Sequence, residues 1–264
     1  MYKIFCLIIM SLFVVGCNAP SQVESAAESV VQTASTAVES AQEVVAQTAS
    51  TTVESAQEEV EVAAAAEPSN GLMIYPSAEE TQPLQVGAAV PGFSVLTVEG
   101  GDKSFPAGQR DKPLMLVTFR GGWCPYCNVH LEELQEVVPE LTAAGMEVAF
   151  LSGDRPEILY AGLKDGAQAT AKDKNYVIYS DAKVEAASAL GIAFKTPEAM
   201  RSRLIDKRGA TDGSVDLHSA LSVPSIYIVD TSGQVAFVHT DPDYKVRLSA
   251  ADTKAAAMAV LARN

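Results

Sequence analysis

Cys124 and Cys127 stand in the run Cys-Pro-Tyr-Cys, which has the residue types and spacing best suited to chemistry in this sequence. Two intervening residues in a helical turn bring the two sulfurs within reach of a disulfide. A thiol at the start of a helix lies near unpaired N–H groups and the positive end of the helix dipole, which stabilise the thiolate. We therefore expect Cys124 to be the nucleophile. Cys127, deeper and less exposed, would be the resolving thiol.

The residues around the pair predict a tight loop that leads into a helix. Gly121 and Gly122 allow backbone conformations that other residues resist. Pro125 suits the first helical turn, because its missing N–H would be unpaired there. Trp123 and Tyr126 are interpreted as an apolar rim of the site rather than as groups that stack on bases.

Other uses of a cysteine pair fit the sequence less well. A zinc site needs two further ligands, and His130, His218 and His239 form no second pair at metal-ligand spacing. Covalent haem attachment needs His directly after Cys127, where Asn128 stands. A structural disulfide that closes so small a loop would add little stability. We expect no metal and no organic cofactor, with copper binding through a distant histidine kept as the less favoured alternative.

Apolar runs and helical periodicity indicate the elements that position this site. Three runs of strand length are continuously apolar or nearly so: Leu114–Phe119, 146–151 and 176–179. Helical spacing follows two of them, in Leu131, Leu134, Val138 and Leu141 before Gly145, and in residues 184–190 before Gly191. Strands buried on both faces and alternating with helices predict an α/β fold with a central sheet flanked by helices.

The C-terminal part predicts a hairpin and a final helix. Residues 225–230 and 234–239 are apolar strands that flank a Thr-Ser-Gly turn. Ser249 and Asp252 form a capping pattern for an Ala-rich helix that ends near Ala262.

With these elements the sequence resembles the thioredoxin superfamily, specifically its peroxiredoxin-like branch (AhpC/TSA, redoxin). The resemblance is carried by residues 119–128 (FRGGWCPYCN), 223–235 (VPSIYIVDTSGQV) and 238–247 (VHTDPDYKVR), and it spans about residues 87–260. It implies a thioredoxin-like fold with a central mixed β-sheet, and an enzyme that is a thiol-disulfide oxidoreductase or a thiol peroxidase. It also implies an external dithiol or disulfide protein as partner.

The resemblance assigns a role to Pro224 and Val223. In similar proteins the proline is cis and faces the disulfide, which leaves neighbouring backbone groups free to accept an extended substrate. We expect the same here. The alternative is a trans proline that begins an edge strand.

The sequence departs from peroxiredoxins at Gly121, where they carry the Thr or Ser that binds peroxide. Dithiol-disulfide exchange is therefore the leading hypothesis, and thiol-dependent peroxide reduction the alternative. Arg120 or Arg247 would supply a guanidinium for the thiolate and a developing oxyanion. For Arg247, a solvated charge beside Asp241 or Asp243 is equally open.

Three further residues are candidates for roles near the pair. His130 could share a proton with Cys127, although a structural histidine is the favoured interpretation. Asp154 and Arg155 follow a strand at an edge where ligands often bind, or begin a helix. The acceptor of the Cys127 proton is not identified.

The N-terminus predicts a lipoprotein signal peptide over residues 1–16. Lys3 precedes an apolar run of residues 4–15, too short to span a bilayer. The run ends in Val-Val-Gly-Cys, which resembles a bacterial lipobox, so Cys17 is the expected lipidation site. The alternative is an ordinary signal peptide or uncleaved anchor. We expect a lipid anchor in the cell envelope, with the outer membrane or the periplasmic face favoured.

Residues 17–70 read as a spacer between this anchor and the domain of residues 71–264. They hold nine Glu and no Asp, Lys, Arg, Gly or aromatic residue, so they cannot bury a core. QTASTAVESAQE at 32–43 recurs nearly unchanged at 47–58. A solvated spacer is favoured over an oligomerising stalk.

The charge balance argues against one large class of partner. The chain has 19 Lys and Arg against 33 Asp and Glu, a net charge of -14. No basic surface large enough to neutralise a phosphate backbone is expected, so nucleic-acid binding is not predicted.

Overall fold

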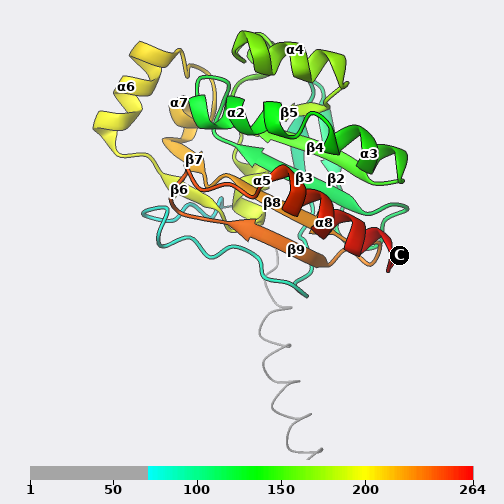
Figure 1. The fold of residues 1–264 in the computed structure, drawn as a ribbon. Helices are drawn as coiled ribbons and strands as arrows, with labels where there is room; N and C mark the ends of the chain where they lie inside the picture. Colours follow the sequence, from blue (N-terminus) through cyan, green and yellow to red (C-terminus); the bar gives the residue numbers. More distant parts are fainter. Residues whose placement is uncertain (1–70, 264) are drawn as a thin grey trace, which may run out of the picture. The chain divides into compact units, whose positions relative to one another are not determined.

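The computed structural model describes residues 71–263. The predicted signal peptide, Cys17 and the spacer therefore lie outside the described residues. Within the described part, a seven-stranded sheet has the order β2-β1-β5-β4-β3-β8-β9 (Figure 1). Its strands are β1 (Phe93–Leu96), β2 (Asp102–Phe105), β3 (Leu114–Phe119), β4 (Glu147–Ser152), β5 (Ile178–Ser180), β8 (Ser225–Val229) and β9 (Val235–Thr240).

The sheet is mixed. β3, β4 and β5 run parallel to one another, whereas β8 pairs with β3 antiparallel, and β1 does so with β5. β6 (Ala193–Lys195) and β7 (Ala220–Ser222) form a separate two-stranded antiparallel sheet. This arrangement confirms the predicted α/β class with a central mixed sheet.

Helices cover the sheet on both faces, and β3 is therefore buried along its whole length. Met115, Val117 and Phe119 face one core together with residues of α2, α3, α4 and α8, while Leu114 and Leu116 face a second core with residues of α5 (Figure 1). The helices are α2 (Pro125–Glu133), α3 (Val137–Ala143), η1 (Pro156–Ile158), α4 (Asp165–Asp173), α5 (Glu185–Ala189), α6 (Glu198–Arg208), α7 (Ser214–His218) and α8 (Ala250–Leu261).

Most predicted elements are confirmed, with one correction. The strands near 146–151 and 176–179, the hairpin and the Ser249-capped helix are all present, and the Ser249 side chain accepts a hydrogen bond from the Asp252 N–H. The single helix expected through Leu131 and Leu141 is instead two helices, α2 and α3. Pro139 has no N–H for the carbonyl four residues back and its ring crowds that group, so the regular helix is interrupted before it.

Among residues 71–263, no helix combines the length and apolarity needed to cross a membrane.

Candidate active site

The cysteine pair lies at the junction between β3 and α2. Cys124 is the N-cap residue of α2, with extended backbone angles (φ -85°, ψ 115°), and Pro125 occupies the first turn as predicted. A β-carbon added at Gly121 would collide with the Trp123 indole nitrogen and lie 2.7 Å from Asp154 Oδ1. One at Gly122 would lie 2.5 Å from the backbone of Gly162. The loop is therefore packed too closely for the Thr or Ser that peroxiredoxins carry at position 121.

Two buried polar side chains hold this loop in place. Asp154, which follows β4, accepts a hydrogen bond from the Gly122 N–H at 2.6 Å and one from the Ser152 hydroxyl at 3.0 Å. Asn128, in α2, donates to the carbonyls of Gly122 (2.7 Å) and Cys124 (2.8 Å). Loop and helix are thus tied together by groups that have no competing water.

The two thiols are free in this structure and have opposite acidities. A hydrogen bond from the Cys127 side chain lowers the pKa of Cys124 to about 6, against the effect of burial, and the charges of Arg120 and Arg247 act in the same direction. Burial raises the pKa of Cys127 well above its usual range. Cys124 is therefore the thiolate at neutral pH, and Cys127 keeps its proton.

The expectation that Cys124 is the more exposed thiol is wrong. Each cysteine has only 1% of its surface exposed, and both belong to the core cluster against which Trp123 packs. The N-cap position puts Cys124 at the positive end of the helix but does not place its side chain at the surface. Large reactants cannot reach this sulfur in the observed conformation.

The two arginines contact different groups near the pair. Arg120 is 7% exposed, and its guanidinium lies 5.3 Å from the Trp123 ring and 4.4 Å from the Tyr244 ring. Arg247 Nη2 lies 3.8 Å from Cys127 Sγ. Within residues 71–263, no ion pair joins Arg247 to a carboxylate, and its other guanidinium nitrogen, Nη1, donates to the Val246 carbonyl at 2.8 Å.

The backbone beside Pro224 is not free for a substrate, which corrects the expectation drawn from similar proteins. The Val223 N–H donates to the Ile192 carbonyl at 2.9 Å. The Val223 carbonyl accepts from the hydroxyls of Thr118 (3.1 Å) and Ser225 (2.9 Å). An extended peptide would have to break these internal bonds in order to pair with Val223.

A cavity of about 230 Å³ adjoins the site. Arg120, Val223 and Pro224 line it from the side of the sheet, and Tyr244 lines it from the segment after β9. Tyr126 is exposed and meets Tyr244 edge to face at 5.6 Å between ring centroids. Of the six predicted supporting residues, Arg120, Val223 and Pro224 line the cavity, and the other three, Trp123, Tyr126 and Arg247, do not.

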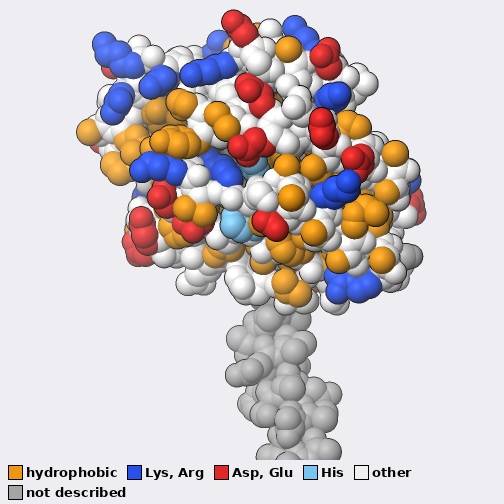
Figure 2. Space-filling model, viewed as in Figure 1, with side chains coloured by type: hydrophobic (Ala, Val, Ile, Leu, Met, Phe, Trp, Pro, Cys, Tyr) orange, Lys and Arg blue, Asp and Glu red, His pale blue; other side chains and the backbone are white. Residues whose placement is uncertain are grey.

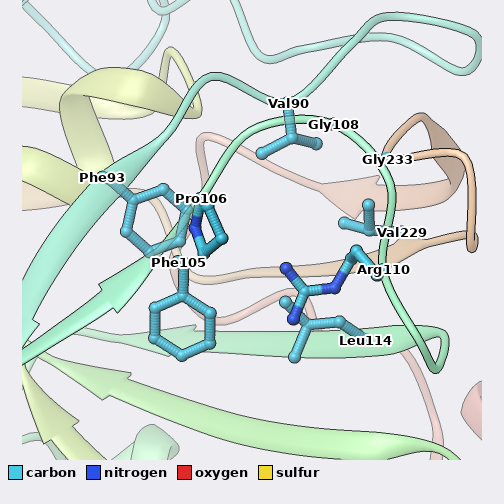
Figure 3. A pocket seen from close by; sticks show the side chains of 9 residues that line it. All are labelled: Val90, Phe93, Phe105, Pro106, Gly108, Arg110, Leu114, Val229 and Gly233. Carbon is cyan, nitrogen blue, oxygen red and sulfur yellow. The ribbon is translucent and has the colours of Figure 1, made fainter.

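A second hollow is too small to hold a substrate (Figure 3). Its volume is about 10 Å³, which admits about one water molecule. Leu114 at the start of β3 lines it, so it lies at the end of that strand away from the cysteines. Among residues 71–263, no group of three or more His, Cys, Asp or Glu side chains is arranged to hold a metal ion.

The chain matches a known protein family. The sequence profile described as the AhpC/TSA family matches residues 86–238, more than half of the chain. The chain belongs to the AhpC/TSA family. This AhpC/TSA protein is accordingly a thiol-dependent enzyme, either a thiol peroxidase or a thiol-disulfide oxidoreductase. The matched region contains the cysteine pair, Arg120 and Pro224, and ends before Tyr244 and Arg247.

Solved structures similar to this AhpC/TSA chain include the following three. Peroxidoxin BcpB from Mycobacterium tuberculosis is 16% identical with a TM-score of 0.45, covering 68% of this chain and 97% of its own. A peroxiredoxin-like protein from Aquifex aeolicus is 18% identical with a TM-score of 0.44, covering 68% and 89%. Reduced Prx3 from Vibrio vulnificus is 20% identical with a TM-score of 0.45, covering 66% and 99%. The comparison with curated proteins gave no match.

Sequence reasoning missed several residues that complete the site. Asn128 was noted only as the residue that excludes haem attachment, and Asp154 only as a strand-end residue. Thr118 was included only as part of the apolar run Leu114–Phe119. Its hydroxyl donates to the Val223 carbonyl and also accepts a hydrogen bond from the Ser225 N–H at 2.8 Å. A polar side chain within a continuously buried strand was the available signal, because such a group needs a partner. Tyr244 had no signal of its own.

Proposed function

We propose that this protein is a dithiol peroxidase in which Cys124 reduces a hydroperoxide and Cys127 resolves the product. The observation that carries the proposal is the closed site: Cys124 is buried with a pKa of about 6, and the Val223 backbone is fully hydrogen-bonded within the protein. A peroxide is small enough to reach Cys124 after a slight movement of the residues that bury it, whereas a folded protein is not. Membership in the AhpC/TSA family supports the same chemistry.

The reaction begins at the Cys124 thiolate. Its sulfur attacks one oxygen of the hydroperoxide, so an S–O bond forms while the O–O bond breaks, and the leaving alkoxide takes up a proton to become an alcohol. Cys124 is then a sulfenic acid. The Cys127 sulfur attacks it, forming the disulfide and releasing water. The peroxide has gained two electrons from the two thiols, and an external dithiol must return them.

The two arginines stabilise the negative charges that arise during this reaction. Arg120 and Arg247 both lower the pKa of Cys124, so both hold the sulfur in its reactive form. Arg247 Nη2, 3.8 Å from Cys127 Sγ, also favours the thiolate that Cys127 must become in the second step. Guanidinium groups here stabilise the developing negative charge without a metal.

Thiol-disulfide exchange with a protein partner is the second candidate. It is favoured by the low pKa of Cys124 together with a resolving thiol one helical turn away. In that reaction the Cys124 sulfur attacks a partner disulfide, and Cys127 then displaces the reduced partner. The buried sulfur would require the loop to open first.

Stopped-flow fluorescence separates the two candidates. Mixing the reduced protein with hydrogen peroxide should change the emission of Trp123, the single tryptophan of the chain. The Cys124→Ser variant should show no change, and Cys127→Ser should show a first phase without disulfide formation. Rapid reduction of insulin by a protein that ignores peroxide would overturn the peroxidase proposal in favour of disulfide exchange.

We also propose that the enzyme is lipid-anchored through Cys17 in the cell envelope. The support is the sequence alone: an apolar leader that ends in Val-Val-Gly-Cys, followed by a spacer that holds nine Glu and no basic residue. The peroxidase domain would then stand away from the membrane and meet oxidants and dithiol partners outside the cytoplasm.

A further inference from the structure

The cavity beside Arg120 has walls from several separate parts of the chain. Ala78 belongs to the segment before β1, Phe194 to β6, Met200 to α6, and Pro224 to the segment before β8. These four side chains are apolar, and the volume of about 230 Å³ approaches the ~300 Å³ of the smallest ligand pockets. The cavity therefore suits an apolar body of about a dozen non-hydrogen atoms.

Arg120 places an unpaired cation in this wall. Its guanidinium is packed between the rings of Trp123 and Tyr244, its Nη2 lies 3.8 Å from Met200 Sδ, and its Nε is buried without a hydrogen-bond partner. Within residues 71–263, no carboxylate forms an ion pair with it. Its charge acts on the Cys124 thiolate, but its buried Nε–H has no acceptor, so an anion in the cavity that accepts a hydrogen bond from Arg120 recovers part of the cost of that unpaired donor.

The other charges around the cavity also favour an anion. Lys195 lines the wall and is exposed, and the wall contains one carboxylate, the exposed Glu79. Pro197, the N-cap residue of α6, lines it too, so the positive end of that helix faces the same space. Figure 2 shows Lys and Arg side chains gathered over α6 next to hydrophobic ones.

We propose that this cavity binds an apolar organic acid, with the carboxylate paired to Arg120 and the apolar body against Phe194, Met200 and Pro224. If the protein is the peroxidase proposed above, its preferred oxidants are the hydroperoxides of such acids. Arg120 directly follows β3, four residues before Cys124, so an acid paired to it is bound next to the loop that carries the reacting thiol. The reduced product is the corresponding hydroxy acid, by the electron balance given above.

Binding is tested first without any redox step. Calorimetric titration of the reduced full-length protein compares 4-isopropylbenzoate with the neutral 4-isopropylbenzamide, which has nearly the same shape. We expect the acid to bind at least about tenfold more tightly, as a buried charge-assisted pair requires. Lys195→Gln should weaken the acid severalfold. Lys174→Gln makes the same charge change on an exposed residue outside the cavity wall and should have no effect.

A cavity-filling variant supplies a second measurement. Ala78→Phe should abolish binding of both compounds, because the added ring occupies the space of the apolar body. Equal affinities for acid and amide, or an acid that binds Ala78→Phe as well as wild type, would overturn the proposal. The Lys195→Gln comparison keeps the test decisive if Ala78→Phe does not fold.

Turnover then connects the cavity to the chemistry. Cumene hydroperoxide and its 4-carboxy derivative differ only in the charged group, and kcat/KM should favour the carboxylated compound by about tenfold in wild type. The ratio should approach one in Ala78→Phe. Acid binding with no peroxide consumption would refute the peroxidase proposal alone, while peroxide consumption without acid binding would refute the cavity proposal alone.

Discussion

The acidities of the two sulfurs depend on each other. Cys124 is stabilised as a thiolate mainly because the protonated Cys127 thiol donates a hydrogen bond to it. Cys127 stays protonated because it is buried beside that thiolate. The helix end alone would not explain the asymmetry, since both thiols lie in the same helical turn and are equally shielded from solvent. The pair therefore works as one unit with one reactive sulfur.

Removing the donor should raise the pKa of Cys124. Wild-type protein should show thiolate absorbance that rises through a midpoint near pH 6, and peroxide reduction should rise over the same range, because the thiolate is the nucleophile. In Cys127→Ala the midpoint should move upward. Ultraviolet titration measures this, with Cys124→Ser subtracted as the baseline.

Cys127→Ser is the matched control, because a serine hydroxyl can still donate a hydrogen bond to the thiolate. Its midpoint should lie closer to that of wild type than the midpoint of Cys127→Ala does. Identical midpoints in the two variants would show that Cys127 does not lower the pKa of Cys124 through a hydrogen bond.

The β3–α2 junction is the element on which the site depends. Asp154 holds Gly122 from one side, and Asn128 holds Gly122 and Cys124 from the other. The backbone of Gly121 cannot move toward Asp154 or Trp123, because both already occupy the space next to its α-carbon. Precise placement of the sulfur therefore comes from neighbours and not from the loop itself.

Asp154→Ala should weaken both the fold and the reaction. The Gly122 N–H would lose its buried acceptor, which we expect to lower the free energy of unfolding by about 1–3 kcal/mol. Peroxide reduction should fall by about tenfold or more, since the loop no longer holds Cys124 in place. Urea unfolding and stopped-flow fluorescence measure the two effects. Ser152→Ala, which removes only a neutral partner of Asp154, should have the smaller effect on both; the reverse order would count against the clamp.

His130 links α2 to the segment before α8. Its Nε2 lies 3.2 Å from the Leu248 carbonyl, which can only accept, so Nε2 carries the proton. Burial, with the nearby charge of Arg247, lowers the pKa of His130 to about 4. The histidine is thus a neutral structural link and does not exchange a proton with Cys127 at neutral pH.

This link predicts a loss of stability in acid. Because the folded-state pKa lies below the unfolded value, the contribution is complete above pH 6.5 and is lost as pH falls toward about 4, by about 3 kcal/mol. His130→Gln can donate the same hydrogen bond without titrating. Its unfolding free energy should therefore fall less than that of wild type between these pH values, as measured by urea titration. Parallel pH profiles would refute the assignment. Asp181, whose pKa burial raises to about 7, is common to both proteins and cancels.

The whole chain combines a closed redox domain with N-terminal sequences of a different character. Residues 71–263 carry the site, whereas the proposed anchor and spacer precede them. If Cys17 is lipidated, Cys17→Ala should leave the protein unlabelled by radioactive palmitate and release it from the membrane fraction. Cys6→Ala, within the proposed leader, should leave both labelling and membrane association intact. A Cys17→Ala protein that stays with the membrane would exclude this anchor.

The cysteine spacing, the glycine-rich loop and the buried strand runs were sufficient to predict the α/β fold, the proximity of the two cysteines and the strand-to-helix junction. These predictions rest on local properties. A helical turn brings two sulfurs together wherever it occurs, and a strand as apolar as β3 must be covered on both faces, as it is here. The exposure of Cys124, the hydrogen bonds of Val223 and the pairing of Arg120 with Trp123 and Tyr244 could not be read in this way. They arise where segments far apart in sequence pack together, since a residue's burial and its hydrogen-bond partners are properties of its neighbours.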